Sequence, residues 1–307
     1  CTFNIESNLK KKLDHLSVEA EIAVREGCKH LILSDKNISE KKSAIPMILA
    51  FGAINSKLIN LGIRGFVSIN VQTSEALDTH SFAVLLGVGA TTINPYLVFD
   101  SIYQRYNKKL FGKFSYEECI QRYIQSIDNG LLKIMSKMGI SVLSSYRGGC
   151  NFEAVGLSRA IVSEYFPGMI SRISGIGIFG IEKKLKKLHQ KTFQKGVSIL
   201  PIGGIYKYRK NGENHQYQGQ LIHVLQQAVI TNSYETYKKY AKGVYALPRI
   251  NLRDLLDFKI LGKKININAV ESIESLRKRF GSGSMSHGAL SAEAHETLAI
   301  AMNKIGA

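Results

Sequence analysis

The fold is decided by a strand–helix–strand pattern in the first quarter of the chain. Cys28-Lys29-His30-Leu31-Ile32-Leu33-Ser34 is a short apolar run that is typical of a strand. Residues 46–61 carry apolar side chains at helical spacing and stop before Gly62, a residue that suits the turn after a helix. Gly65-Phe66-Val67-Ser68-Ile69-Asn70-Val71 then alternates like a second strand. Two strands joined by a helix predict a parallel pair in an α/β fold.

The same alternation extends outward from this unit. Apolar residues at helical spacing predict helices at residues 9–24, 79–86, 96–106 and 116–138. The last of these helices is expected to be interrupted near Asn129-Gly130, and further strands are expected at residues 90–93 and 140–143. We therefore predict a mainly parallel sheet flanked by helices.

The pattern changes near residue 200. Residues 195–204 contain three glycines and Pro201, and a polar, aromatic segment follows before helices expected at 220–229 and 234–245. We predict one domain over residues 1–200 and a second over residues 201–307. The second ends on a loop of small residues that opens a final helix, where backbone amides can approach a phosphate or a flat ring: Gly281-Ser282-Gly283-Ser284-Met285-Ser286-His287-Gly288.

The bulk composition is that of a globular protein. The chain has 307 residues, of which 45% are hydrophobic and 21% charged. It has neither a secretion signal nor a run of about 18 apolar residues, the length that a membrane span requires. Its four cysteines lie far apart without metal-ligand spacing, and Cys1 lacks the small-residue context of an N-terminal nucleophile. We expect a cytoplasmic protein with no metal site and no catalytic residue.

The net charge of +17 raises the question of a nucleic-acid partner. The strongest feature is the stretch from Lys183 to Lys210, with nine Lys or Arg and no Asp or Glu. Ile181, Leu185 and Leu188 fall at helical spacing, which places the lysines on the opposite, solvated face. A solvated helix face is the favoured interpretation; a basic face that binds RNA or an acidic partner is the alternative.

A formal G-x-G-x-x-G motif occupies residues 175–180. A dinucleotide site would require a strong strand before the motif and an acidic residue about 20 positions after it. Residues 171–174 make a poor strand, and the sequence has no Asp or Glu between Glu182 and Glu213. The motif therefore favours a structural turn.

Polar loops follow three of the expected strands. Ser34-Asp35-Lys36 follows the first, and Gln72-Thr73-Ser74-Glu75 follows the second. Residues 144–149, with Arg147 before two glycines, follow the strand expected at 140–143. In an open parallel sheet such loops gather at the carboxyl edge, where ligands bind. Capping and turn formation also explain Asp35 and Ser74, whereas Arg147 suits an anion or a neighbouring domain.

Several motifs together resemble the interior of the glutamate synthase large chain. They follow one another in the same order as in that family and cover essentially the whole sequence. They are Ile32-Leu33-Ser34-Asp35-Lys36 with Ile45-Pro46-Met47, Leu86-Gly87-Val88-Gly89-Ala90 with Asn94-Pro95-Tyr96-Leu97, residues 131–141, Ser145-Tyr146-Arg147-Gly148-Gly149, residues 152–157, residues 171–177, residues 234–241 and Met285-Ser286-His287-Gly288.

The resemblance implies a fold and an activity. The family makes two glutamates from glutamine, 2-oxoglutarate and a reductant, with a glutaminase domain, a central α/β domain and a (β/α)8 barrel that carries FMN and a 3Fe-4S cluster. Residues 1–200 are similar to the central domain, and residues 201–307 to the incomplete start of the barrel. The resemblance implies partners among the remaining glutamate synthase domains or chains, a small beta subunit or ferredoxin, and neither membrane nor nucleic acid.

The resemblance also implies site residues. Met285, Ser286 and Gly288 match a family loop at the FMN, although His287 replaces the usual aromatic residue. Met47 and the pair Thr73 and Ser74 are the candidates for the wall of the ammonia passage between the two active sites. Because the glutaminase residues, the cluster cysteines and most of the flavin and 2-oxoglutarate sites are not in this sequence, we expect the chain to be a fragment without turnover of its own. The alternative is a non-catalytic scaffold or binding protein that uses the basic stretch.

Overall fold

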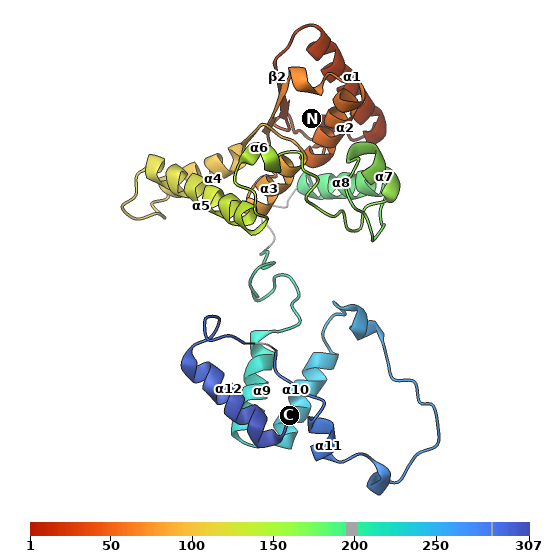
Figure 1. Cartoon of the computed structure of the whole chain (residues 1–307), viewed down its shortest axis with the longest axis vertical. Helices are drawn as coiled ribbons and strands as arrows, with labels where there is room; N and C mark the ends of the chain where they lie inside the picture. The colour runs from red at the N-terminus through yellow and green to blue at the C-terminus, as the bar shows by residue number, and fades with distance from the viewer. Residues whose placement is uncertain (195–201, 284) are drawn as a thin grey trace. The chain divides into compact units, whose positions relative to one another are not determined.

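The computed structural model describes residues 1–194, 202–283 and 285–307. The chain divides into two compact units, Cys1–Leu200 and Pro201–Ala307 (Figure 1). The first combines strands and helices, and the second is built from helices and long loops. No helix in the described residues is both long and apolar enough to cross a bilayer.

A three-stranded parallel sheet lies at the centre of the first unit. Its strands are β2 (His30–Ser34), β4 (Ser68–Gln72) and β5 (Thr92–Asn94), with β4 in the middle. His30 pairs with Ser68, and Asn70 pairs with Thr92. The predicted α/β class and parallel sheet are confirmed. The second strand is shorter than predicted, because its first residues form the 3-10 helix η1 (Arg64–Phe66).

Helices connect the strands as the periodicity predicts. They are α1 (Leu9–Arg25), α2 (Met47–Asn60), α3 (Thr79–Gly87) and α4 (Tyr96–Asn107). The Asn8 side chain caps α1 by accepting from the Lys11 amide, and Asp78 caps α3 by accepting from the Ser81 amide. Before α2, the short strands β1 (Thr2–Asn4) and β3 (Lys42–Ala44) pair antiparallel.

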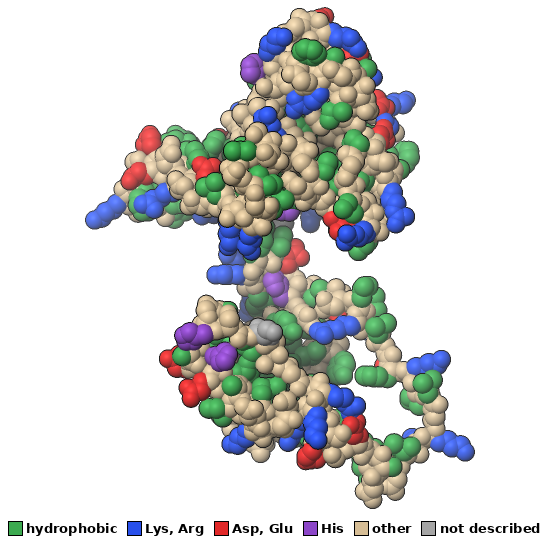
Figure 2. All heavy atoms as spheres, viewed as in Figure 1, with side chains coloured by type: hydrophobic (Ala, Val, Ile, Leu, Met, Phe, Trp, Pro, Cys, Tyr) green, Lys and Arg blue, Asp and Glu red, His purple; other side chains and the backbone are tan. Residues whose placement is uncertain are grey.

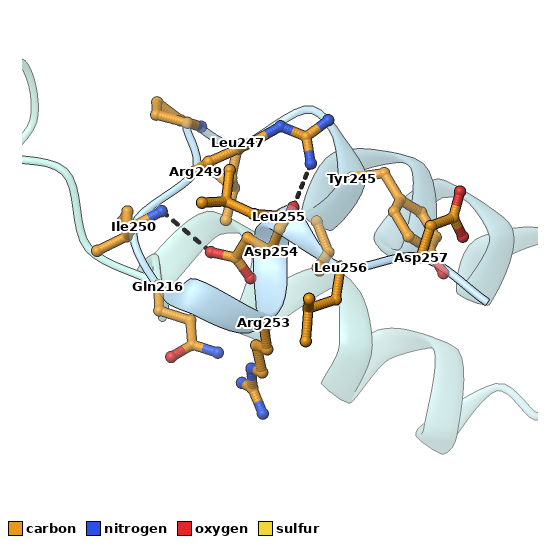
Figure 3. A pocket seen from close by; sticks show the side chains of 12 residues that line it. Gln216, Tyr245, Leu247, Arg249, Ile250, Arg253, Asp254, Leu255, Leu256 and Asp257 are labelled. Atoms are coloured by element: carbon orange, nitrogen blue, oxygen red, sulfur yellow. Dashed lines mark hydrogen bonds between the residues drawn. The ribbon is translucent and has the colours of Figure 1, made fainter. Parts of the chain in front are cut away.

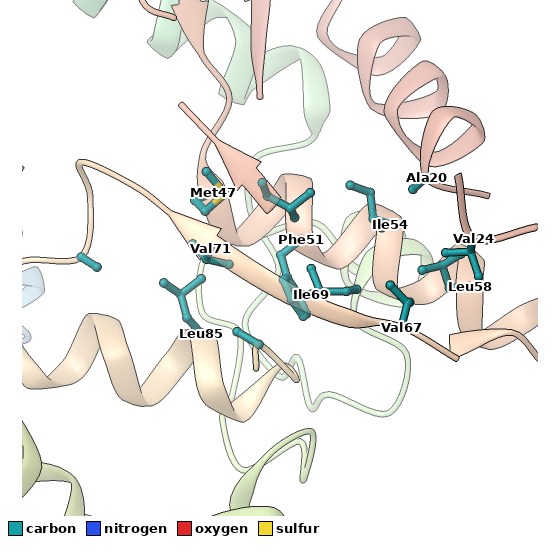
Figure 4. Packing of buried hydrophobic residues seen from close by; sticks show 13 residues of the cluster. Ala20, Val24, Met47, Phe51, Ile54, Leu58, Val67, Ile69, Val71 and Leu85 are labelled. Carbon is teal, nitrogen blue, oxygen red and sulfur yellow. The ribbon is translucent and has the colours of Figure 1, made fainter. Parts of the chain in front are cut away.

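The main core forms between the sheet and α2. Figure 4 shows Ile69 and Val71 of β4 beside Met47 and Phe51 of α2, and all four side chains are buried. Ala20 and Val24 bring α1 into the same cluster. Because each buried side chain of this size contributes roughly 1.5–3 kcal/mol, this cluster holds the strand–helix–strand unit together.

The long helix α5 (Tyr116–Lys137) runs without the interruption predicted near Asn129-Gly130, so that prediction was wrong. Ser115 and Glu118 form a capping box at its start, with reciprocal bonds of 3.2 and 2.7 Å. Gly130 faces α3, and a Cβ atom there would lie 2.5 Å from the Thr79 side chain. Gly130 therefore permits a close helix–helix approach and does not break the helix.

The prediction of a strand at residues 140–143 was also wrong. The chain instead forms the short helix α6 (Leu143–Tyr146). Val142 and Leu143 are 52% and 43% exposed, so the apolar run does not enter the sheet. Tyr146 is buried, and its hydroxyl donates to the Ala83 carbonyl at 3.2 Å. The bond from Tyr146 to Ala83 stabilises a helical turn at a position where the local sequence predicts a strand.

Two further helices, α7 (Arg159–Tyr165) and α8 (Ile178–Thr192), complete the first unit. Ile181 and Leu185 pack against a second buried cluster that includes Leu9 and Leu13, but Leu188 is 64% exposed and lies outside that apolar face. The Leu9 amide donates to Glu182 Oε2 at 2.9 Å. Glu182 therefore fastens α8 to the first turn of α1.

The second unit is helical in its described part. Helices α9 (Gly219–Ile230) and α10 (Tyr234–Tyr245) pack together, and no strand is present among residues 202–283 and 285–307. The remaining elements are η2 (Leu252–Leu255), η3 (Ile267–Ala269), α11 (Ile273–Arg277) and α12 (Ala292–Ile305). Figure 2 shows hydrophobic side chains at the surface of the extended segment between α10 and α11, and Phe258 is 97% exposed.

Candidate functional site

A buried carboxylate organises the carboxyl edge of the sheet. Asp35 follows β2 and is completely buried. The Thr73 hydroxyl donates to Asp35 Oδ2 at 2.7 Å, and the Ser74 hydroxyl donates to the same oxygen at 3.1 Å. The Ser74 amide lies 3.0 Å from Oδ2 and 3.2 Å from Oδ1. A buried charge requires such donors, so the carboxylate fixes the loop after β4 in one geometry.

The parallel register explains why these residues meet. Ser34 pairs with Gln72, which places the next residues of β2 and β4 side by side. The Thr73 amide donates to the Asn94 carbonyl at 3.0 Å and carries the network to β5. Tyr96 follows β5, and burial together with Asp35 raises the pKa of its phenol to about 12. The Tyr96 phenol therefore stays protonated at neutral pH.

A second carboxylate ties the start of α2 to this edge. The Met47 amide donates to Glu75 Oε2 at 2.7 Å, which satisfies a free amide at the helix start. Burial of the carboxyl group raises the pKa of Glu75, and Asp35 adds repulsion. Glu75 as a whole is exposed, but its carboxylate group lies against the buried Met47. This contact displaces water from the carboxylate.

The structure thus places Met47, Thr73 and Ser74 in one connected network. The Met47 side chain lies in the main core, and Thr73 is fully buried, whereas Ser74 is partly exposed. Of the three, Ser74 is the residue that solvent reaches. The sequence placed Glu75 in the polar loop after the second strand, but its bond to the Met47 amide was not predicted. Tyr96 was not predicted as a site residue, although its position after the end of β5 was an available signal.

The third polar loop does not reach this edge, which corrects the expectation for residues 144–149. The Gly148 amide donates to the Leu86 carbonyl at 3.2 Å. Arg147 lines a cavity with His30 and Ser68, the first residues of β2 and β4. The loop lies at the amino edge because residues 140–143 form no strand of the sheet.

The G-x-G-x-x-G motif covers a β-bridge between Leu157 and Ile176 and the start of α8 at Ile178. The Ile176 amide donates to the Gly156 carbonyl at 3.0 Å, and Gly177 is the N-cap of α8. No regular strand precedes it in residues 171–174. The motif has a structural role, because a Cβ atom at Gly175 would clash with the Gly156 backbone, but it forms a bridge and a helix start in place of the predicted turn.

The loop at Met285–Gly288 is open. Met285 is partly exposed, while Ser286 and Gly288 are exposed, and a Cβ atom at Gly288 would meet no neighbour within 4 Å. The Ser291 hydroxyl accepts from the Ala294 amide at 3.3 Å and so caps α12. The described loop leaves space for a flat ring but does not enclose one. Residue 284, within the predicted loop, lies outside the described residues.

A cavity of about 650 Å³ lies in the second unit (Figure 3). Asp254 is its central polar side chain: Oδ2 accepts from the Ile250 amide at 3.0 Å and from the Asn251 amide at 2.9 Å. These amides lower the pKa of Asp254. The carboxylate is thereby used in shaping the turn around η2. In the described part of the chain, no group of three or more His, Cys, Asp or Glu could hold a metal ion.

Comparisons with known proteins assign both units to one family. A family model described as glutamate synthase central domain matches residues 1–158, and one described as conserved region in glutamate synthase matches residues 215–307. The sequence is 52% identical over 299 residues to the "Glutamate synthase [NADPH] large chain" of Azospirillum brasilense. The match covers 97% of this chain and 20% of that relative.

Other relatives match over the same extent. A "Glutamate synthase [NADPH] large chain" of Bacillus subtilis is 41% identical over 300 residues, and a "Ferredoxin-dependent glutamate synthase" of Pyropia yezoensis is 39% identical over 311 residues. Each match covers 97% of this chain and 20% of the relative. The chain therefore spans about a fifth of the length of the curated relatives it matches.

Proposed function

The chain belongs to the glutamate synthase family, and we propose that it forms the connecting part of a glutamate synthase large chain. The complete enzyme would make two glutamates from glutamine, 2-oxoglutarate and a reductant. The observation that carries the proposal is the ordered match to two successive glutamate synthase regions, with 52% identity across 97% of the chain. Such a chain contributes to ammonia assimilation through the surfaces it offers to other parts of the enzyme.

The two units would have different tasks. We assign residues 1–200 to the central domain and residues 201–307 to the first part of the FMN-binding domain. The described part of the second unit contains no strand. The assignment to the start of the barrel therefore depends on the family match at residues 215–307. In the complete enzyme, Met285, Ser286 and Gly288 would contribute one edge of the flavin site. Because the loop is open, the other walls of the flavin site would come from the rest of the enzyme. The 3Fe-4S site of the family would lie there too.

The carboxyl edge of the sheet is the proposed wall of the ammonia passage. Ser74 would present its hydroxyl to the passing ammonia, while Thr73 and Met47 would hold the wall from behind. Asp35 fixes Thr73 and Ser74, so the edge keeps its shape. This assignment draws support from the connected network and from the polar, uncharged character of the partly exposed hydroxyl.

Partners follow from the same assignment. The names of the relatives include NADPH and ferredoxin, so the proposed electron donor is one of these, delivered by a small beta subunit or by ferredoxin itself. The alternative of an RNA-binding face finds no support: α8 packs Ile181 and Leu185 into the first unit, and Lys186 pairs with Glu182 at 2.7 Å.

A chimeric enzyme tests the proposal. Residues 1–307 would replace the matching stretch of the Azospirillum brasilense large chain, which is 52% identical. We expect the chimera to retain glutamine-dependent glutamate synthesis. Ser74→Trp in the chimera should lower that rate several-fold and leave synthesis from added ammonium unchanged, because external ammonium does not use the passage.

The matched control is Ser126→Trp, which places the same bulk on the exposed side of α5. It should leave both rates unchanged. A chimera that folds and holds flavin but lacks activity would contradict the proposal that residues 1–307 work as the connecting part of a glutamate synthase large chain. Equal loss of both rates in Ser74→Trp would contradict the role in the passage.

A further inference from the structure

An unneutralised cluster of basic groups lies at the amino edge of the sheet, opposite the proposed passage wall. Two adjacent cavities, of about 410 and 310 Å³, share Arg64, Gly65 and Arg147 in their walls. The larger also includes Lys29 and His30. No Asp or Glu lines either cavity in the described residues.

Arg64 is held rigidly at the centre of this cluster. Its Nε donates to Asn55 Oδ1 at 2.6 Å, its Nη1 to the Val67 carbonyl at 2.7 Å and its Nη2 to the Gly89 carbonyl at 3.0 Å. All three acceptors are neutral, so the guanidinium is oriented but its charge is not compensated. A guanidinium has five N–H donors, which leaves one on each Nη without an acceptor among the described residues.

Arg147 brings a second guanidinium to the same place. Gly148, which follows it, donates to the Leu86 carbonyl at 3.2 Å and lies beside Gly89, so the main chain that carries Arg147 is fixed. The Arg147 side chain is exposed and has no carboxylate partner in the described part of the chain. Burial and repulsion from Arg147 lower the pKa of Arg64. Two like charges held close together are stabilised when an anion binds between them.

Lys29, which lies directly before β2, adds a further positive charge. Lys29 precedes the strand and His30 begins it, and the Ser68 amide donates to the Lys29 carbonyl at 2.9 Å. The Lys29 backbone is therefore part of the sheet framework. The smaller cavity extends from the arginines along apolar side chains that include Ile59 and Met169. One end of the combined site thus suits an anionic group and the other a small organic body.

We propose that this amino-edge cavity pair binds a phosphate group, as the free ion or as part of a small phosphorylated compound. A phosphate carries up to two negative charges and accepts the forked N–H pairs that Arg64 and Arg147 offer. The site does not depend on the proposed passage, which lies at the other edge of the sheet. It would give the chain a ligand-responsive site separate from ammonia transfer.

Calorimetric titration of the 307-residue chain with inorganic phosphate tests the proposal, with sodium chloride at matched ionic strength as the reference. We expect saturable binding of phosphate, and Arg147→Gln should weaken it about ten-fold, the loss of roughly one charge-assisted hydrogen bond. Lys29→Gln should weaken it less, because a lysine contributes a single point charge. Arg105→Gln, an equal charge change on the exposed part of α4, should leave the affinity unchanged.

Two further titrations identify the ligand. Glycerol 3-phosphate distinguishes the source of the phosphate: tighter binding than the free ion assigns the site to a phosphorylated compound, and equal affinity assigns it to the free ion. Succinate should bind more weakly than phosphate. No saturable phosphate binding, equal affinities of Arg147→Gln and the unaltered chain, or tighter binding of succinate would overturn the proposal.

Discussion

The Thr73 hydroxyl donates to Asp35 Oδ2 at 2.7 Å, and both residues are completely buried. A buried carboxylate is tolerated because hydroxyl and amide donors replace the water it has lost. The pair joins the ends of β2 and β4, so one hydrogen bond contributes both to the stability of the sheet and to the shape of its carboxyl edge. Removing the charge should therefore be felt in the whole first unit.

Asp35→Asn should destabilise the first unit by about 2–4 kcal/mol. The amide keeps the shape of the carboxylate but carries no charge, so the bonds that Thr73 and Ser74 donate to the remaining oxygen become weaker. Its NH₂ group can only donate, so the bond from the Ser74 amide to Oδ1 is lost. Urea unfolding followed by circular dichroism measures the change, since the chain has no Trp. Asp128→Asn on the exposed side of α5 is the control. A loss below about 0.5 kcal/mol would show that the network is dispensable.

Glu182 should make the first unit less stable in acid. The Lys186 ammonium and the Leu9 amide lower the pKa of Glu182 relative to its ordinary value of 4.5. Because the folded pKa lies below the unfolded one, the stabilising contribution is complete above the unfolded pKa and is lost as the pH falls through the folded pKa. Glu182→Gln should therefore cost stability at pH 7 and cost progressively less below pH 4.5.

Comparing urea midpoints of Glu182→Gln and the unaltered chain at several pH values measures this effect. The difference between the two proteins isolates Glu182 from the other carboxylates. A difference that stays constant from pH 7 to pH 3 would mean that the charge of Glu182 does not fasten α8 to α1.

The local pattern predicts the first unit well where periodicity and packing agree. The strand β2 (His30–Ser34) can be recognised as a short apolar run, and α2 can be recognised because its apolar residues repeat with the period of a helix. The short run at residues 140–143 is ambiguous by the same rule, and the contact that decides it, from Tyr146 to Ala83, comes from a distant helix. Tertiary contacts therefore override the pattern in short apolar segments.

The candidate sites divide in the same way. Asp35 and Ser74 could be predicted to meet, because residues that follow parallel strands gather at one edge. The approach of Arg64 to Arg147 could not, because the sequence placed Arg147 after a strand that does not form. The bond between the Glu75 carboxylate and the Met47 amide could not be predicted either, because it depends on how the loop after β4 folds toward the start of α2.

Gly130→Ala should destabilise the first unit although alanine favours helices. The added Cβ would lie 2.5 Å from the Thr79 side chain, so α3 and α5 must move apart. We expect a loss of about 1–3 kcal/mol, typical of overpacking. Combining it with Thr79→Ala should recover part of that loss, and urea unfolding of the two single variants and the double variant measures the coupling.

Gly219→Ala is the matched control for this substitution. Gly219 begins α9, and a Cβ atom there meets nothing within 4 Å. The change should be neutral or stabilising by up to about 1 kcal/mol. If Gly130→Ala also proved neutral, it would contradict the claim that Gly130 is required for the close approach of α3 to α5.

The purified chain should bind no stoichiometric FMN. Gly288 and Ser286 are exposed, and the loop offers a single open side to a flat ring. A flavin held by one edge gives up little water and gains few contacts. Absorbance near the flavin maximum after incubation with FMN and gel filtration measures retention. A yellow complex with one FMN per chain would show that the second unit encloses the ring unaided.

The exposed apolar side chains between η2 and α11 should make the isolated chain self-associate. Phe258, Ile260 and Leu261 are 97%, 90% and 84% exposed, an arrangement that a soluble surface rarely keeps uncovered. Sedimentation velocity should show concentration-dependent growth that the double substitution of Ser for Phe258 and Ile260 reduces. Because these side chains make little buried contact, the same substitutions should leave the unfolding midpoint unchanged. A chain that stays monomeric at high concentration would contradict an uncovered interface here, and a lowered midpoint would show that the two side chains pack within the unit.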